Sequence, residues 1–321
     1  MSSNGSGRPP RSAGSARPGR DGFLRRMGRY PLSLVGLIFV LFFLFIALFG
    51  PLLAPYPYDQ IIRGTDVGLE TRRALTGEPP SNSFPLGTDQ RGRDILSRML
   101  WGARETIGLP LTATLIAVVI GAFIGLLIGY LGGAVDTIVS RFLDSIISIP
   151  IMVLALVMIS TIVPLLSASE LAVVQRLGPG KISLTIVVVI IYIPIIARVV
   201  RSATLGVRSA GYIEEAQLRG ESLIYILIRE VLPSVMPALV VEASLRLSYA
   251  IIIVASLGFL GLGVQPPSPE WGRMVLDARP RMMQEPWMIW SPVLGIALLI
   301  VSLNLMSDGL RHVLRGADAD E

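Results

Sequence analysis

The chain has 321 residues, of which 52% are hydrophobic and 16% are charged, and its formal net charge is +5. Ordinary globular domains carry about 25% charged residues, so this composition nearly excludes a soluble enzyme. There is no cysteine and only one histidine, His312, which excludes disulfides, thiolate metal sites and cysteine nucleophiles and argues against a histidine-based zinc or triad site. We therefore expect no catalytic residues, no metal and no cofactor.

Residues 1–30 form a basic arm that is poor in large apolar side chains and rich in Gly, Pro, Ser and Arg, so we expect it to be disordered. It holds seven arginines and no aromatic residue before Phe23, a pattern that indicates a topology signal rather than nucleic-acid binding. The positive-inside rule then places the N-terminus in the cytoplasm. A cleavable signal peptide is the alternative, but the apolar stretch that follows is longer than a signal peptide's, and no small-residue cleavage pair precedes Pro51.

Six uncharged apolar stretches predict transmembrane helices, because about 20 residues are needed to cross roughly 30 Å of hydrocarbon. In chain order the predicted spans are 31–50, 106–135, 145–169, 182–197, 247–269 and 286–307. The fourth is short, and we expect Lys181 and Arg198 to extend it by reaching the two membrane interfaces. The predicted fold class is therefore an all-α polytopic membrane protein with six transmembrane helices.

The segments between the spans define the remaining organisation. Residues 51–105 are predicted to be an external loop that ends in an interfacial helix, because Ile95, Met99 and Ala103 share one helical face; a helix packed outside the membrane is the alternative. Residues 106–310 are predicted to be a five-helix core with a cytoplasmic loop at 201–234. Residues 311–321 are predicted to be a cytoplasmic tail, which puts both termini on one side. The inferred cytoplasmic pieces hold 15 Lys or Arg against 12 in the external pieces, a shallow bias in the expected direction.

One ionisable pair lies inside the predicted membrane region. Glu242 and Arg246 are one helical turn apart, so we expect them to neutralise each other, unless Arg246 reaches a neighbouring subunit. A proton relay needs more titratable groups than the predicted spans contain. This argues against a proton-driven carrier that works alone.

Other residue types predict packing and anchoring. Glycines at every fourth position of the second span predict the close approach of another helix, and two prolines predict kinks in the third and fourth spans. Three tryptophans lie where an external aromatic belt is expected. These residues are Gly121, Gly125 and Gly129, then Pro150 and Pro194, then Trp271, Trp287 and Trp290.

The segment between the fourth and fifth spans contains a short amphipathic helix. It runs from about Ser209 to Arg219, breaks at Gly220 and meets the next span at Pro233. Tyr212, Ile213 and Ala216 face one way, and Glu215 and Arg219 are expected to pair on another face. Such a helix suits docking into a groove on a cytoplasmic partner; a solvated connecting helix is the alternative.

The spacing Glu214-x-Ala216-x3-Gly220, closed by Leu232-Pro233, resembles the Glu-Ala-Ala loop of permease subunits in binding-protein-dependent ATP-driven importers. In that family the loop forms a coupling helix that enters a cleft in the ATPase subunit. Glu215 stands where the family usually has Ala, and Glu230 where an aliphatic residue is common. The residues to which the resemblance assigns ATPase coupling are Tyr212, Ile213, Glu214, Glu215, Ala216, Gly220, Leu232 and Pro233.

Two further stretches, 86–104 and 257–272, resemble external segments of the oligopeptide, dipeptide and nickel branch of these importers, in the second permease of the pair. The matches together run from about residue 85 to 311. The resemblance implies the type I permease fold of ABC importers in a bacterial or archaeal plasma membrane. It also implies a second homologous permease, two ATP-binding subunits and an extracytoplasmic solute-binding protein as partners.

The resemblance assigns ATP hydrolysis to other chains, and the sequence agrees, because no phosphate-binding Gly-x4-Gly-Lys-Ser/Thr motif surrounds the single lysine, Lys181. Peptides are the commonest cargo of the family, while nickel and glycosides stay open, and the sequence identifies no substrate-binding residue. Two rival functions remain. An ion-coupled secondary transporter or channel would need intramembrane charges or inverted repeats, and a membrane enzyme would need clustered acids or histidines near an interface.

Overall fold

A computed structural model describes residues 31–68 and 72–318 of the chain, so the predicted disordered arm at 1–30 lies outside the described residues. The described part is nearly all helical and contains no strand, only two isolated bridges, Arg63 with Ala74 and Thr88 with Asp94. The helices are α2 (Pro31–Leu53), η1 (Gly64–Val67), α3 (Ile95–Leu131), α4 (Gly133–Ile147), α5 (Ile151–Ser167), α6 (Ala172–Leu177), α7 (Pro179–Val207), α8 (Gly211–Leu218), α9 (Leu223–Tyr225), the π-helical η2 (Ile226–Val231), α10 (Leu232–Phe259), α11 (Trp271–Ala278), η3 (Arg279–Arg281) and α12 (Trp287–Asp318).

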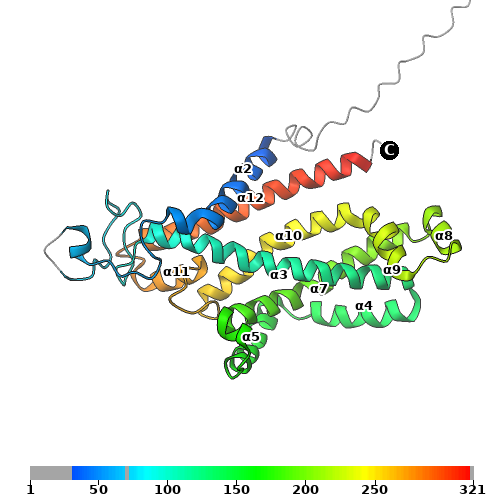
Figure 1. Cartoon of the computed structure of the whole chain (residues 1–321), viewed down its shortest axis with the longest axis horizontal. Helices are drawn as coiled ribbons and strands as arrows, with labels where there is room; N and C mark the ends of the chain where they lie inside the picture. The colour runs from blue at the N-terminus through cyan, green and yellow to red at the C-terminus, as the bar shows by residue number, and fades with distance from the viewer. Residues whose placement is uncertain (1–30, 69–71, 319–321) are drawn as a thin grey trace, which may run out of the picture.

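The long helices run side by side along an elongated bundle (Figure 1). The segment 54–94 and α11 lie at one end, and α8 and α9 lie at the other. The start of α2 and the end of α12 both point toward the end that carries α8. This arrangement separates the irregular segment 54–94 from the residues 211–233, which resemble the ATPase-coupling loop and are called the coupling motif below.

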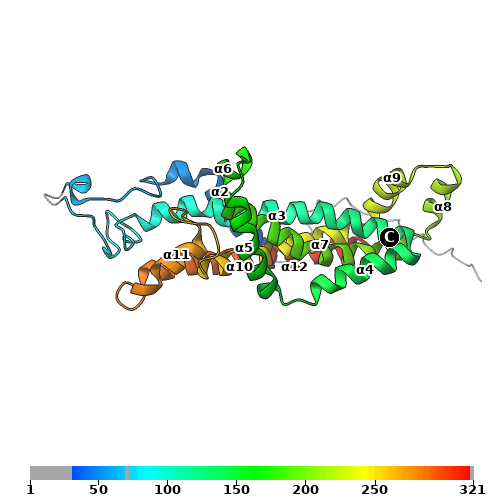
Figure 2. The ribbon, with the colours of Figure 1, turned by 90° about the horizontal axis from the view of Figure 1, so that it is seen from below.

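Five helices are long and apolar enough to cross a membrane, and the count rises to six if the bent pair α4 and α5 forms one span. The predicted all-α fold with six spans is confirmed in this sense. The third span is not straight, because α4 and α5 meet at an angle of 88°. Pro150 precedes α5 with an extended ψ of 128°, and it lacks the N–H that a continuous helix would need there. Figure 2 shows α5 crossing the direction of α3 and α7.

The predicted interfacial helix at 94–104 is not a separate element, because α3 runs without a break from Ile95 to Leu131. The predicted apolar face is correct, since Ile95 and Ala103 are fully buried, but it packs on α2, α11 and α12 instead of on lipid. At about 1.5 Å per residue α3 is about 55 Å long, which is longer than a bilayer core of about 30 Å. The helix therefore exceeds the hydrocarbon core, and its charged residues Arg98, Arg104 and Glu105 lie in its first three turns.

Three further helices extend past the charged residues that marked the ends of the predicted spans. The predicted fifth span at 247–269 is in fact α10, Leu232–Phe259, which begins before Glu242 and Arg246. The fourth span grows from 182–197 to Pro179–Val207, and the sixth continues to Asp318, so residues 311–318 are helical. Charge-free length is a poor guide to these boundaries, because an ionised side chain with a partner is tolerated inside a helix.

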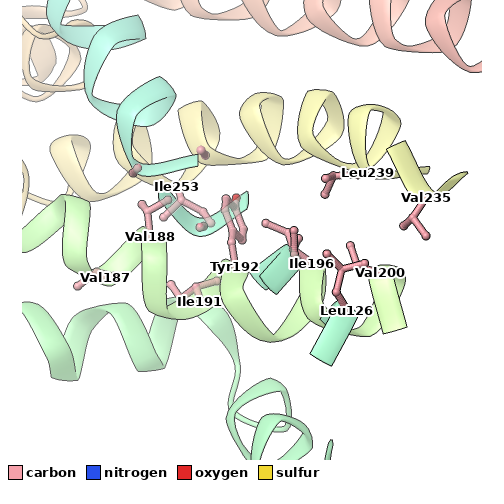
Figure 3. Packing of buried hydrophobic residues seen from close by; sticks show 14 of the residues in the cluster. Leu126, Val187, Val188, Ile191, Tyr192, Ile196, Val200, Val235, Leu239 and Ile253 are labelled. Carbon is pink, nitrogen blue, oxygen red and sulfur yellow. The ribbon is translucent and has the colours of Figure 1, made fainter. Parts of the chain in front are cut away.

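The largest apolar cluster surrounds α7, whose buried side chains pack between α3 and α10 (Figure 3). Val188, Tyr192 and Ile196 come from α7, and Leu126 and Val235 meet them from α3 and the start of α10. Two ion pairs, Arg198 with Asp144 and Arg201 with Asp136, join α7 to α4. The cluster also includes residues of α8, so it reaches the segment that carries the coupling motif.

At the other end, the buried Arg98 ties α3 to two loops. Its guanidinium donates to the carbonyl oxygen of Tyr58 at 3.0 Å and to the carbonyls of Pro267 and Ser268 at 3.4 and 3.3 Å. Its Nε lies 3.7 Å from Oδ2 of Asp89. One arginine therefore fixes the segment 54–94 and the loop after α10 to the same helix.

The start of α11 is buried against α3. Trp271 is 2% exposed and its Nε1–H donates to the Met99 carbonyl at 3.1 Å, so its predicted place in an aromatic belt is wrong, whereas Trp290 is 58% exposed. Glu270 caps α11 by accepting from the N–H groups of Gly272 and Arg273. Burial raises the pKa of Glu270 to about 7, because these two bonds offset only part of the desolvation of the carboxylate.

Candidate functional site

The coupling motif forms a helix, a turn and a second helix, as the sequence predicts. α8 spans Gly211–Leu218, and Gly220 ends it with a φ of +77°. The Gly220 N–H donates to the Gln217 carbonyl at 2.9 Å, and the Glu221 N–H donates to the Ala216 carbonyl at 3.2 Å. A positive φ at this place favours glycine, because other residues pay a steric penalty there.

One face of α8 is part of the core of the bundle. Ile213 and Ala216 are fully buried and belong to the cluster around α7. They are joined there by Ile226 and Val231 of η2, which is itself continuous with α10. Apolar packing of this kind resists sliding, because cores are close-packed. α8 is therefore packed directly against the segment that leads into α10.

Polar contacts hold the two ends of α8. The hydroxyl groups of Tyr212 and Ser234 lie 2.9 Å apart, which links the first turn to α10. The Gln217 side-chain amide donates to the Tyr130 hydroxyl at 2.8 Å, which links the last turn to the end of α3. α8 is therefore connected to two of the long helices, directly and through its core face.

The predicted ion pair between Glu215 and Arg219 is not present. Arg219 instead lies 3.7 Å from carboxylate oxygens of both Glu221 and Glu230. The last turn of α8 ends before Arg219, so the side chain projects toward the returning segment instead of back along the helix. Glu230, which departs from the aliphatic residue common in the resembled family, thus provides a partner for Arg219.

The opposite face of α8 and its neighbouring turn are exposed. Glu214 and Glu215 are exposed, and beside them Leu218 is 88% exposed and Ile224 is 61% exposed. Exposed apolar side chains beside charged ones are typical of interaction surfaces. Leu218 and Ile224 were not singled out from the sequence. For Leu218, the available signal was a large aliphatic residue on the side of α8 away from Ile213 and Ala216.

Leu232 is half-buried and Pro233 is exposed. They are the first two residues of α10, which continues from η2, so the missing N–H of Pro233 removes one hydrogen bond from this helix. Immediately before them the backbone takes a π-helical turn, η2, an irregularity that often marks functional positions.

The intramembrane pair forms as predicted. Arg246 Nε donates to Glu242 Oε1 at 2.6 Å, and the guanidinium also lies 5.9 and 5.4 Å from the ring centroids of Tyr192 and Tyr249. Glu242 is 8% exposed. The two charges neutralise each other and the rings stabilise the cation, so this arrangement has the character of a structural pair.

Within residues 31–68 and 72–318, no group of three or more His, Cys, Asp or Glu side chains is placed to hold a metal ion. The motif itself contains acids, hydroxyls and apolar groups but no convergent nucleophile and base. It presents acidic and apolar side chains on the exposed side of a helix that is packed on the bundle.

Comparisons with known proteins match nearly the whole chain. The family described as "Binding-protein-dependent transport system inner membrane component" matches residues 96–316, and the "N-terminal TM domain of oligopeptide transport permease C" matches residues 20–74. The first match includes α8 and the complete motif.

Two relatives align with this chain over most of the length of both proteins. The di/tripeptide transport system permease protein DppC of Pseudomonas aeruginosa (strain UCBPP-PA14) is 36% identical over 282 residues, which cover 88% of this chain and 87% of that protein. The glutathione transport system permease protein GsiD of Shigella flexneri serotype 5b (strain 8401) is 38% identical over 298 residues, or 91% and 88% of the two chains.

A solved structure has a similar fold. A chain of the MetNI methionine ABC transporter, in an inward-facing conformation, superposes with a TM-score of 0.53 at 20% sequence identity. The superposition covers 68% of this chain and 95% of that chain. At this identity the likeness concerns the arrangement of helices alone.

Proposed function

The chain belongs to the family of binding-protein-dependent transport system inner membrane components, and from this membership we propose that it forms half of the pore of an ATP-driven peptide importer. A second homologous permease supplies the other half, two separate ATP-binding subunits hydrolyse ATP, and an extracytoplasmic solute-binding protein delivers the solute. The cargo we propose is a di- or oligopeptide, because the relatives named above are permeases of di/tripeptide and glutathione systems.

The burial pattern of α8 supports its role as the coupling element. Ile213 and Ala216 are fully buried in the core of the bundle, whereas Glu214 and Glu215 are exposed. An ATPase subunit that grips the exposed face would move the buried face with it. ATP-driven closure of the two ATPase subunits would then tilt α10 and its neighbours between inward-open and outward-open arrangements.

We place the protein in a bacterial plasma membrane with α8 and both termini in the cytoplasm. The start of α2 and the end of α12 point toward the α8 end of the bundle, and the arginine-rich arm directly precedes α2. Positive residues next to a first span favour the cytoplasmic side. The segment 54–94 then faces the solute-binding protein.

The experiment purifies the complete complex with a tag on this chain and measures the recovery of the ATPase subunits and their hydrolysis of ATP. Glu214→Arg should abolish both, because it reverses a charge on the proposed contact surface. Gly220→Pro should do the same, because proline cannot adopt the φ of +77° found at that position.

Glu78→Arg is the matched control, because Glu78 is an exposed acid in the segment at the opposite end of the bundle. This variant should retain wild-type recovery of the ATPase subunits, and all variants should insert into the membrane at wild-type levels. Full recovery and coupled transport with Glu214→Arg and Gly220→Pro would contradict the coupling role. Solute uptake by the purified chain alone would contradict the importer itself.

A further inference from the structure

A cavity of about 900 Å³ opens beside the first half of α3. Its other walls are α6, the first turns of α7 and the loop that follows α10. Tyr58 and Pro269 also line it, so it lies toward the end of the bundle that carries the segment 54–94. Its volume is within the range of about 300–1,000 Å³ that is usual for small-molecule sites.

Three charged side chains line this cavity, Arg104, Glu105 and Lys181, and the last two form an ion pair. Lys181 Nζ lies 2.5 Å from Glu105 Oε1, and both residues line the cavity. The side chains are 39% and 24% exposed, so the pair is accessible to solvent and contributes little to stability. A partly exposed pair of this kind can exchange its internal contact for contacts with a solute.

The carboxylate of Glu105 is held in place from the other side. The Ser268 hydroxyl donates to its second oxygen, Oε2, and the Ser268 carbonyl in turn accepts from the buried Arg98. Lys181, by contrast, is the first charged residue of α7 and has a long flexible stem. The acid is therefore fixed, while the ammonium group is free to swing away from it.

The rest of the wall is mainly apolar or aromatic. Trp101 and Leu109 of α3 face the cavity together with Leu177 of α6 and Ile186 of α7. Apolar walls with a few convergent charges are typical of sites that bind small amphipathic molecules. Side chains of variable shape find apolar surface here, while charged ends find the acid Glu105 and the cations Lys181 and Arg104.

We infer that this cavity is a contact site for a zwitterionic short peptide, in which Lys181 binds the terminal carboxylate and Glu105 binds the terminal ammonium group. The solute separates the Lys181–Glu105 pair and takes its place. This inference rests on the peptide cargo proposed above, and it adds to that proposal a site on this chain and a basis for recognising free termini.

The first test measures uptake by the complete complex in proteoliposomes with dialanine, N-acetyl-dialanine and dialanine amide as solutes. Lys181→Met should raise the KM for dialanine by about tenfold or more, because it removes one charge-assisted hydrogen bond. It should also reduce the preference for dialanine over its amide, with Arg104 as the remaining cation in the cavity. Glu105→Gln should erase the preference for dialanine over N-acetyl-dialanine. Arg176→Met is the control and should change neither the KM for dialanine nor the two preferences, because Arg176 is exposed on α6 and does not line the cavity.

The second test measures occupancy without transport and uses the absence of cysteine from the chain. In the purified complex, millimolar dialanine should slow maleimide alkylation of the Thr112→Cys variant, whose position lines the cavity. It should not slow alkylation of Asn82→Cys, which is exposed in the segment 54–94. Adding Lys181→Met to Thr112→Cys should remove the protection.

The two tests separate this inference from the proposed function. The proposed site would be contradicted if both charge variants took up dialanine with unchanged KM and unchanged preferences. It would also be contradicted if dialanine did not protect Thr112→Cys. Neither result would contradict the proposed importer function. Protection by added phospholipid that dialanine does not compete with would assign the cavity to lipid and would also overturn the site. Protection by dialanine in a complex that does not transport it would support the site and contradict the proposed cargo.

Discussion

Three glycines set the distance between α3 and α7. A Cβ atom added at Gly125 would lie 2.5 Å from the Ala197 carbonyl oxygen and 2.8 Å from Val200 Cβ. Added Cβ atoms at Gly121 and Gly129 would lie 2.9 and 2.8 Å from side chains of the same helix. The predicted packing role of this glycine series is confirmed, because each position forms direct contact with α7 and leaves no room for a methyl group.

Replacing Gly125 with alanine should therefore destabilise the protein. Overpacking of this kind lowers the free energy of unfolding by about 1–3 kcal/mol, and thermal unfolding in detergent should show a lower midpoint. Gly206→Ala on α7 is the matched control, because a Cβ added there meets nothing within 4 Å and alanine favours a helix over glycine by about 0.5–1 kcal/mol. Equal midpoints for Gly125→Ala and wild type would contradict the close approach of α3 and α7.

At the scale of elements, α8 has two faces with different tasks. Ile213 is fully buried in the cluster to which η2 also belongs, whereas Leu218, five residues later, is 88% exposed. The first face fixes α8 to the bundle, and the second is available to the proposed ATPase partner. The same substitution at the two positions should therefore affect different properties.

Ile213→Asn should lower the unfolding midpoint, because it places an amide without a partner in an apolar cluster at a cost of about 1–3 kcal/mol. Leu218→Asn should leave the midpoint unchanged and weaken the recovery of ATPase subunits with the tagged chain. Thermal unfolding and copurification on the two variants measure these effects. Undiminished recovery of ATPase with Leu218→Asn would exclude Leu218 from the proposed contact surface.

At the scale of the whole molecule, the two ends of the bundle differ in kind. One end carries the 54–94 segment and α11, which Arg98 ties together through the loops, and the other carries α8 and the end of α12. The proposed import mechanism requires that solute enters at the first end and that ATPase subunits bind at the second. The orientation of this axis in the membrane is therefore a direct test of the mechanism.

Single cysteines placed at the two ends should report opposite sides of the membrane. In intact cells, a membrane-impermeant maleimide should label Asn82→Cys and should not label Leu218→Cys until the cells are permeabilised. The native chain contains no cysteine, so each signal comes from one position and the parent chain is the blank. Labelling of Leu218→Cys from outside would reverse the axis and contradict the coupling role.

The sequence by itself determined the helical class, the approximate number of spans and the position of the coupling motif. Long apolar stretches must form helices in a membrane, since their backbone groups find no other partners. The break at Gly220 was predictable as well, because a positive φ favours glycine. These features depend on residues that are close together in the chain.

Only the tertiary structure decided the boundaries and the contacts. Glu242 and Arg246 lie within α10 because they neutralise each other, and α3 continues through 94–104 because α2, α11 and α12 cover its apolar face. The pairing of Lys181 with Glu105 joins residues 76 positions apart in the chain. A charge or an apolar face is stable wherever the folded chain supplies its partner, and hydropathy along the sequence does not contain that information.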